Sequence, residues 1–132
     1  MNDRPWIYFA HSLLIYGNDY EAYCLSLLAK TFANTDIFNP NGQVAQTTDK
    51  EAMKICLATV RSPMCKALCF ATTSGMVGKG CMTEIRLALD RQLPVYCIMG
   101  NKVFLTSSIS FTPIDFSNRV YAIANVACHC ML

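Results

Sequence analysis

One carboxylate in the chain stands where it could carry out chemistry on a glycosidic bond. Glu84 follows a glycine-rich segment, residues 74–80, that is predicted to open a helix. Beside an apolar wall of Met76 and Tyr8, the Glu84 carboxylate could attack the anomeric carbon of a sugar as a nucleophile. The simpler alternative is a solvent-exposed glutamate that gains stability from the dipole of its helix.

The glycine-rich segment, Ser74-Gly75-Met76-Val77-Gly78-Lys79-Gly80, has the composition of a ligand-binding loop. Its glycines allow positive φ and close approach of the backbone, and free N–H groups at a helix start favour an anionic or hydroxyl-rich ligand. Neither a Walker A motif nor the G-x-G-x-x-G dinucleotide pattern is present. The residues expected to contact a ligand here are Ser74, Gly75, Met76, Gly78, Lys79 and Gly80. A helix-opening loop that binds nothing is the alternative.

Two further polar residues follow predicted strands. His11 comes after the first strand, where it could donate a hydrogen bond to a ligand or stabilise its own loop. Asn39 begins an Asn-Pro-Asn-Gly sequence and could contact a ribose or a base, although these residue types are also typical of a simple turn. Both alternatives stay open for each residue at this point.

The eight cysteines are expected to be reduced and mostly buried. The N-terminal residues lack the apolar run of a signal peptide, which predicts a cytoplasmic protein without disulfides. Cys128-His129-Cys130 does not predict a metal site, because three consecutive residues cannot all face one ion and no Cys-x-x-Cys partner exists. We expect neither a metal nor a cofactor, since the chemistry proposed for Glu84 needs only carboxylates and positioning.

The elements that would position these residues alternate along the chain. Apolar runs predict buried strands over 5–10, 35–38, 67–71 and 94–99. Apolar spacing and caps predict helices that begin at Asn18 or Asp19, at Thr48 and at Met82. Each predicted helix has an expected apolar face. For the first helix it is Ala22, Leu25, Leu28, Ala29 and Phe32; for the second it is Met53, Cys56, Leu57 and Val60; for the third it is Ile85, Ala88 and Leu89.

The end of the chain is harder to assign. Residues 103–105 and 109–111 fit an edge hairpin or a loop, and 115–130 fit a closing helix. The alternation before them predicts a doubly wound parallel α/β sheet with helices on both faces. Ligands bind such sheets outside the carboxyl ends of the strands, so segments 11–17, 39–42 and 72–84 are expected to converge on one rim.

Composition limits the remaining possibilities. A chain of 132 residues fits one domain, spanning 1–132, and its 53% hydrophobic content excludes disorder. A net charge of +2 from scattered basic residues argues against nucleic acid as a partner, and no apolar stretch is long enough for a membrane helix. The low charged fraction, 15%, predicts a homo-oligomer, a dimer or larger, with residues 120–132 at the subunit interface.

A family resemblance rests on four segments in order: Ile7-Tyr8-Phe9-Ala10-His11, Asn39-Pro40, Gly80-Cys81-Met82-Thr83-Glu84-Ile85 and Leu93-Pro94-Val95-Tyr96. Together they resemble the nucleoside 2-deoxyribosyltransferase-like superfamily, in particular its short microbial and viral branch, over about residues 7–98. The resemblance implies a three-layer flavodoxin-like (Rossmann-like) fold and a pocket for a nucleoside or nucleotide.

The resemblance also implies roles for two residues. A glutamate four residues after a glycine attacks the deoxyribose C1′ in that family, and Glu84 stands in this relation to Gly80. A tyrosine on the first strand lies near that carboxylate, and Tyr8 matches it. Two places where the transferases carry aspartates hold Thr72-Thr73 and Gly78 here. The chain therefore resembles either an N-glycosidic hydrolase or transferase, or a non-catalytic binding module for a nucleotide or nucleotide-derived signal.

Overall fold

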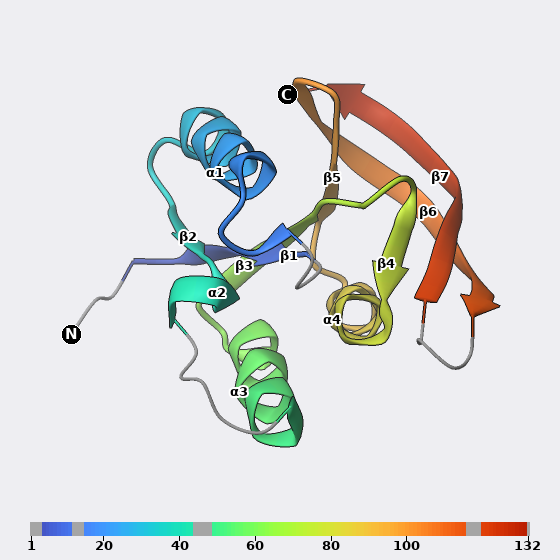
Figure 1. Ribbon diagram of the computed structural model, residues 1–132. Coiled ribbons are helices and arrows are strands. Elements are labelled where there is room, and N and C mark those ends of the chain that lie inside the picture. The colour runs from blue at the N-terminus through green and yellow to red at the C-terminus, as the bar shows by residue number, and fades with distance from the viewer. Residues whose placement is uncertain (1–3, 12–14, 44–48, 116–119, 132) are drawn as a thin grey trace.

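The computed structural model describes residues 4–11, 15–43, 49–115 and 120–131. Helices and strands alternate through the first hundred residues, and a long hairpin follows (Figure 1). In chain order the elements are β1 (Trp6–Ala10), α1 (Asp19–Thr31), β2 (Asp36–Phe38), α2 (Pro40–Gln43), α3 (Asp49–Arg61), β3 (Cys65–Phe70), β4 (Met76–Gly78), α4 (Lys79–Asp90), β5 (Val95–Met99), β6 (Lys102–Asp115) and β7 (Val120–Met131).

The strands form one mixed sheet in the order β2-β1-β3-β5-β6-β7-β4. Its first four strands are parallel, in the places where the apolar runs predicted them. β6 joins antiparallel to β5. In the parallel part, Tyr8 on β1 is in register with Phe38 on β2 and Leu68 on β3. The fold is therefore α/β, and the parallel strands β2, β1, β3 and β5 agree with the predicted alternation, whereas the antiparallel strands β6, β7 and β4 were not predicted.

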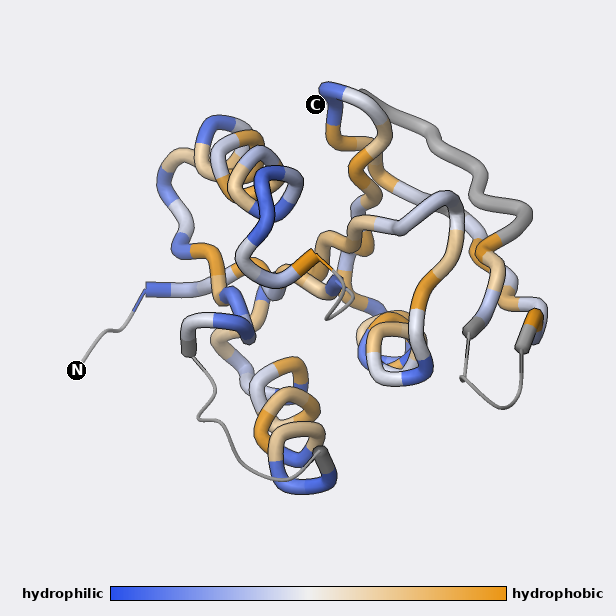
Figure 2. The backbone as a smooth tube through the Cα atoms, viewed as in Figure 1, coloured by the Kyte–Doolittle hydropathy of each residue, from blue (hydrophilic) through white to orange (hydrophobic). Residues whose placement is uncertain are grey.

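Helices cover both faces of the parallel strands, because successive side chains along a strand point to opposite faces. Ile7, Phe9 and Cys69 pack with Cys24 and Leu28 of α1 on one face. The alternate residues pack on the other face with α3 and α4; they are Tyr8, Ala10, Leu68 and Phe70, with Cys56, Val60 and Ile85 from the helices. Figure 1 shows α1 on one side of the sheet and α3 and α4 on the other, and Figure 2 shows that the central strands are mainly hydrophobic.

The closing helix expected over residues 115–130 is wrong. β6 and β7 instead form a long antiparallel hairpin, in which Phe111 pairs with Ile123 and Thr112 with Ala122. The three- and four-residue spacing of Val120, Ile123 and Ala127 suggested a helix, but pairing with a neighbouring strand rich in β-branched and aromatic residues decides the conformation. The edge hairpin or loop expected for 103–105 and 109–111 is also wrong, because both runs belong to one continuous strand, β6, which pairs with β5 and β7.

The glycine-rich segment also differs from the open loop that its composition suggested. Thr73 and Met76 exchange backbone hydrogen bonds of 3.0 Å across a two-residue turn, with φ of 54° at Ser74 and 76° at Gly75. Two positive φ values are the geometry of a tight type I′ hairpin turn, which is why glycine suits the second position. The chain then forms β4, and α4 begins at Lys79 rather than at Met82.

This turn curls the sheet around α4. β4 follows β3 after a short turn, yet it is the last strand in the sheet order and pairs antiparallel with β7. α4 consequently contacts β1, β3, β4, β5 and β7 (Figure 1). On the side of the hairpin, the guanidinium of Arg86 lies 5.1 Å from the ring centre of Phe111 on β6. α4, which carries Glu84, is thus held from several directions.

The predicted apolar faces of two helices are confirmed only in part, since Leu28, Leu25 and Phe32 of the first face pack on the core but its two alanines do not. The buried residues of α1 are Glu21, Cys24 and Leu28, whereas Ala22 and Ala29 are exposed. This orientation brings Glu21 to His11, and a polar contact of this kind cannot be predicted from the spacing of apolar residues. On α4, Leu89 is 39% exposed, while Ile85 and Ala88 are buried as expected. The expected face of α3 is confirmed, with Cys56 and Val60 buried and Met53 and Leu57 half-buried.

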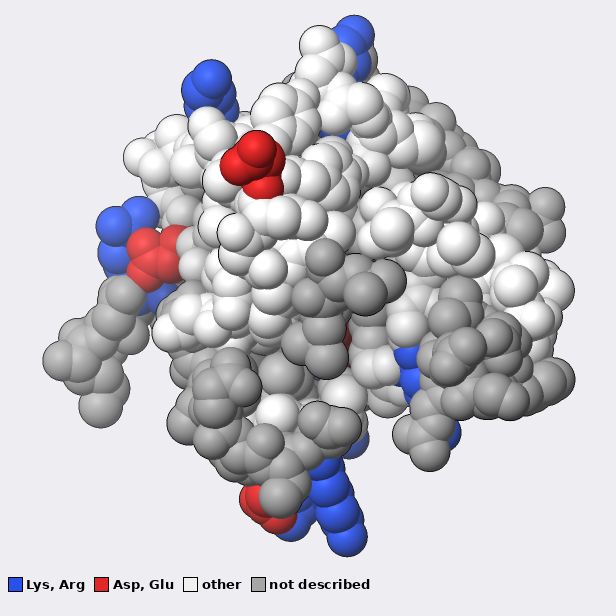
Figure 3. Space-filling view, in the orientation of Figure 1, with Lys and Arg blue, Asp and Glu red and all other residues white. Residues whose placement is uncertain are grey.

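Several smaller features can be compared with the sequence predictions: a helix cap, the cysteines, the charged surface and the search for membrane helices. Asn18 caps α1, and its side-chain oxygen accepts a hydrogen bond from the Glu21 N–H at 3.0 Å. The six cysteines with described side chains are free thiols and buried; Cys128 and Cys130, like the Thr48 cap, lie outside the side chains that the structure describes. Charged side chains are sparse on the face in Figure 3, where most of the described surface is white. Among the described residues, no helix is both long and apolar enough to cross a membrane.

Candidate functional site

Tyr8 and Glu84 meet in the core, as the sequence predicted. The Tyr8 hydroxyl on β1 donates a hydrogen bond to Oε2 of Glu84 on α4, although the two residues are 76 positions apart. Tyr8 is fully buried and Glu84 is 6% exposed. The Tyr8 ring stacks on Phe38 of β2 with centres 5.6 Å apart, which fixes the direction of the hydroxyl. The solvent-exposed alternative for Glu84 is therefore wrong.

A third polar group, the thiol of Cys56, completes this cluster. Cys56 lies on the buried face of α3, in the same core cluster as Tyr8, and it affects the pKa of both Tyr8 and Glu84. Sequence analysis placed Cys56 only on an apolar helix face, because free cysteine usually behaves there as a small hydrophobic residue. No local motif marks it, since the contact depends on how α3 and α4 pack on β1. We call Tyr8, Cys56 and Glu84 the carboxylate cluster.

Burial controls the protonation of the carboxylate cluster. Removal from water raises the pKa of Glu84 to about 7, and the hydrogen bond from Tyr8 and the nearby Cys56 thiol offset only part of that rise. The pKa of Tyr8 is raised far above its ordinary value by burial and then by the nearby Glu84 carboxylate. Burial likewise raises the pKa of Cys56. Near neutral pH the phenol and the thiol therefore keep their protons, while the carboxyl is divided between its two forms.

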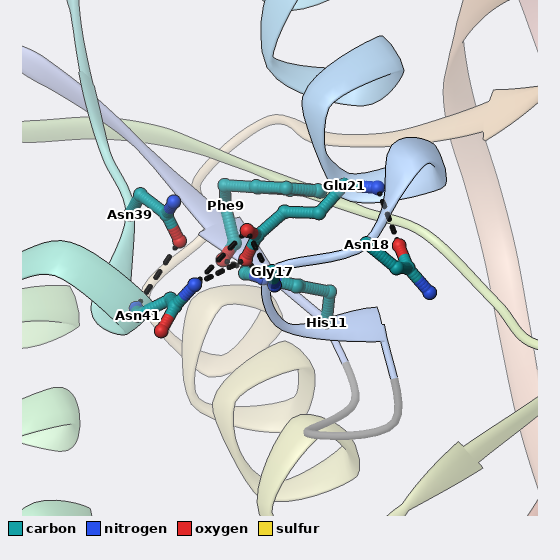
Figure 4. Close-up of polar contacts among 7 residues, drawn as sticks. All are labelled: Phe9, His11, Gly17, Asn18, Glu21, Asn39 and Asn41. Carbon is teal, nitrogen blue, oxygen red and sulfur yellow. Dashed lines mark hydrogen bonds and ion pairs between the residues drawn. The ribbon is translucent and has the colours of Figure 1, made fainter.

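A second polar network lies where β1 and β2 end (Figure 4). Glu21 at the start of α1 accepts hydrogen bonds from the Gly17 N–H at 2.9 Å and from Nδ2 of Asn41 at 2.9 and 3.1 Å. Nε2 of His11 lies 2.8 Å from Oε2 of Glu21, an ion pair when the ring is protonated. Burial raises the pKa of Glu21, but the bonds from Gly17, His11 and Asn41 outweigh it and lower the pKa overall.

The network joins two of the three segments that were expected to converge on one rim. His11 Nδ1 also lies 3.0 Å from the carbonyl oxygen of Phe9, so both ring nitrogens are engaged within the protein. Asn39 accepts a bond from the Asn41 N–H at 3.2 Å, directly before α2. These contacts fit the loop-stabilising alternative for His11 and the turn alternative for Asn39, and ligand contacts by either residue stay predictions.

Two residues of this region were not singled out from the sequence. Glu21 has no local signal, because its partners His11 and Asn41 lie 10 and 20 positions away in the chain. Tyr16 borders the network and contacts His11. Its ring centre is 4.8 Å from that of His11. Burial raises its pKa, and the carboxylates of Glu84 and Glu21 add to the rise. Tyr16 is thus near both glutamates.

The glycine-rich segment lies beside α4 with part of its backbone already bonded. The Met76 N–H donates to the Thr73 carbonyl at 3.0 Å, and the Gly75 carbonyl accepts from the Ile123 N–H at 3.0 Å. Ser74, Gly75 and Lys79 are exposed, whereas Met76, Gly78 and Gly80 are half-buried. A Cβ on Gly80 would lie 3.3 Å from Sδ of Met53 on α3, so close helix packing accounts for this glycine.

The start of α4 is the remaining place for an anionic group. Gly78 is the N-cap and supplies no side-chain acceptor, so the first N–H groups of the helix have no partner from the cap residue. Nearby, the Thr73 hydroxyl oxygen is buried and has no hydrogen-bond partner among the described residues. The predicted contacts of Ser74, Gly75, Met76, Gly78, Lys79 and Gly80 with a ligand remain predictions.

The described residues contain no group of three or more His, Cys, Asp or Glu side chains that could hold a metal ion.

The chain matches no family model, no curated protein and no solved structure. Its functional assignment therefore depends on the geometry of the site.

Proposed function

We propose that this protein cleaves or transfers the N-glycosidic bond of a nucleoside or nucleotide, with Glu84 as nucleophile. The observation that carries the proposal is the buried hydrogen bond between the Tyr8 hydroxyl and Glu84 Oε2. Burying a carboxyl group costs free energy, and such perturbed groups concentrate at functional sites. A pKa of about 7 leaves a substantial fraction of Glu84 ionised at neutral pH, as a nucleophile requires.

The chemistry can be written with these groups and a water molecule. A Glu84 oxygen attacks C1′ of the sugar, the bond from C1′ to the base nitrogen breaks, and its electron pair leaves with the base, which takes a proton from solvent; when water later attacks C1′ and the bond to Glu84 breaks, one proton returns to solvent. The result is a glycosyl ester on Glu84. Water then attacks C1′ and releases the sugar, or a second base attacks and forms a new nucleoside. The Tyr8 hydroxyl orients the carboxylate for the first step and stabilises it when it leaves in the second.

In the flavodoxin-like fold that we propose, the ligand would bind at the carboxyl ends of the parallel strands. In a three-layer flavodoxin-like sheet, ligands lie outside the carboxyl ends of the strands. β1 leads there to His11, and β2 leads to Asn39 and Asn41. The sugar would approach Glu84 from this side, and the N–H groups at the start of α4, which receive no side-chain acceptor from the Gly78 cap, would favour a phosphate or hydroxyl group of the ligand.

The test is release of free base from a panel of deoxynucleosides, ribonucleosides and their 5′-monophosphates, followed by chromatography. We expect release by the natural protein and loss of at least 100-fold of the rate in Glu84→Gln, because the amide is a poor nucleophile. Tyr8→Phe should retain partial activity. The matched control is Asp90→Asn, which removes an exposed carboxylate from the same helix and should leave the rate unchanged. Release that survives Glu84→Gln would contradict the proposal.

A second candidate is a binding module that holds a nucleotide without cleaving it. The observation that favours it is Thr73, whose buried and unpaired hydroxyl occupies a position where the resemblance implies an acid. In that case the same panel would give no free base, but one of its members would raise the melting temperature in a concentration-dependent way.

A further inference from the structure

We propose that Glu21 is a positioning residue for the edge of the sheet where the ligand would bind: paired with a doubly protonated His11, its buried carboxylate fixes three segments of the chain. The role in ligand binding rests on the proposed function, but the effect on the three segments does not. Glu21 contacts His11 after β1, Gly17 before α1 and Asn41 in α2 (Figure 4). The first and last of these follow the carboxyl ends of β1 and β2, where the ligand would lie.

The Glu21 carboxylate has no capacity left to bind a ligand itself. Its Oε1 accepts from the Gly17 N–H at 2.9 Å and from Nδ2 of Asn41 at 2.9 Å. Its Oε2 lies 3.1 Å from the same Nδ2 and 2.8 Å from Nε2 of His11. A carboxylate offers about four acceptor positions, and these contacts occupy them. With 5% exposure, Glu21 can act on a ligand only through the groups that it holds.

The partners of His11 determine which of its ring nitrogens carry protons. Nδ1 lies 3.0 Å from the carbonyl oxygen of Phe9, which can only accept, so Nδ1 is a donor. Nε2 faces the Glu21 carboxylate, which already accepts from the N–H groups of Gly17 and Asn41 and has no proton to give, so Nε2 is a donor as well. A ring that donates from both nitrogens is an imidazolium, and its positive charge balances the buried carboxylate.

The surroundings of His11 make this charge depend on Glu21. The imidazole side chain has no exposed surface, and its ring centre lies 4.0 Å from that of Phe9 and 4.8 Å from that of Tyr16. A buried charge that loses its partner is strongly disfavoured. In Glu21→Gln the ring should therefore lose the proton on Nε2 and accept a hydrogen bond from the new amide, while Nδ1 keeps its bond to Phe9.

The first experiment records the ring nitrogens of His11 by ¹⁵N NMR at pH 7.5. The chain has one other histidine, His129, so a His129→Gln variant identifies the signals. We expect two protonated nitrogens in the natural protein, one in Glu21→Gln, and two again in Glu21→Asp, which keeps the charge. The matched control is Asp19→Asn, which removes an exposed acid from the same helix turn and should leave the ring unchanged. A single proton on the natural ring, or two in Glu21→Gln, would overturn the proposal.

The second experiment measures the order of α2 without a substrate. Backbone ¹⁵N relaxation reports motion within the folded state, so a change in overall stability does not enter. We expect the order parameters of Asn41 and Gly42 to fall from about 0.85 in the natural protein toward about 0.6 in Glu21→Gln, because α2 loses its charged anchor. Leu68 in the centre of the sheet should not change. Unchanged order in α2, or an equal fall at Leu68, would overturn the proposal.

Kinetics of base release then separate this inference from the proposed function. If both hold, Glu21→Gln raises KM by about tenfold, the equivalent of one hydrogen bond to a charged group, with little change in kcat, and Glu21→Asp recovers part of the loss. A fall in kcat at unchanged KM would overturn the positioning role. If the ring protons and the order of α2 change as expected but no protein of the series releases a base, the positioning by Glu21 stands and the proposed function fails. If base release depends on Glu84 but the ring and α2 ignore Glu21, the reverse holds.

Discussion

Replacement of Glu84 by glutamine should change how stability depends on pH, because only the carboxyl can ionise. In the folded protein burial raises its pKa from the ordinary 4.5 to about 7. Between these two values the unfolded chain gives up the Glu84 proton while the folded protein keeps it. The unfolded state therefore binds fewer protons, and stability falls as pH rises through this window. Below about pH 4.5 both states are protonated and the residue contributes nothing.

The size of the effect follows from the displacement of the pKa. At about 1.36 kcal/mol per pH unit, a rise from 4.5 to about 7 corresponds to a loss of about 3 kcal/mol that is complete above pH 7. Glutamine is nearly isosteric and can still accept the bond from Tyr8. Relative to the natural protein, Glu84→Gln should thus gain about 3 kcal/mol in the free energy of unfolding between pH 4 and pH 8.

The assay is urea unfolding at several pH values in a reducing buffer, followed by circular dichroism. All groups other than Glu84 titrate in both proteins, so they cancel in the difference between the two free energies. Asp90→Asn, which removes an exposed carboxylate, should give a difference that does not change with pH. A flat difference for Glu84→Gln would show that water reaches the carboxyl in the folded protein, and the reasoning from burial would be wrong.

Three further predictions concern other parts of the molecule. Gly75→Ala should destabilise the protein by about 1 kcal/mol because φ is +76°, whereas Gly78→Ala, with φ of −78° and open space around its Cβ, should be nearly neutral in the same thermal melts. Glu21→Gln should cost about 1.5–3 kcal/mol at pH 7 through the lost charged bond to His11. Because the Glu21 pKa is lowered, that loss should vanish as pH falls below about 4.5, and a loss that persists undiminished at pH 3 would contradict the ion-pair account. Light scattering after size exclusion should give the mass of a dimer or larger, as the low charged fraction predicts, and a 14.7 kDa species at all concentrations would refute this.

The parallel part of the sheet could be predicted because its strands are buried on both faces. Such strands are short continuous apolar runs, as in residues 67–71, and the turns and caps between them have clear signals at Asn18 and Asn39. Residues 120–131 lack such a signal. Their apolar residues fit a helical spacing and a strand equally, and only the partner strand β6 decides between the two.

The candidate site could be predicted in part for a similar reason. Tyr8 and Glu84 stand at the places that the family resemblance implies, so their meeting could be anticipated. Cys56 and Glu21 could not, because each acquires its role from partners brought close by tertiary packing. In the chain, a cysteine on an apolar helix face and a glutamate in the first turn of a helix are both ordinary.

The covalent step on Glu84 can be measured directly. The protein is mixed with each deoxynucleoside and deoxynucleotide of the panel, quenched rapidly with acid and digested, and the peptides are analysed by mass spectrometry. The proposed mechanism predicts a deoxyribosyl or deoxyribosyl-phosphate group on the peptide that contains Glu84, formed together with free base and absent from Glu84→Gln. Free base formed without any adduct on that peptide, or an adduct on a different carboxylate, would contradict the assignment of Glu84 as the nucleophile.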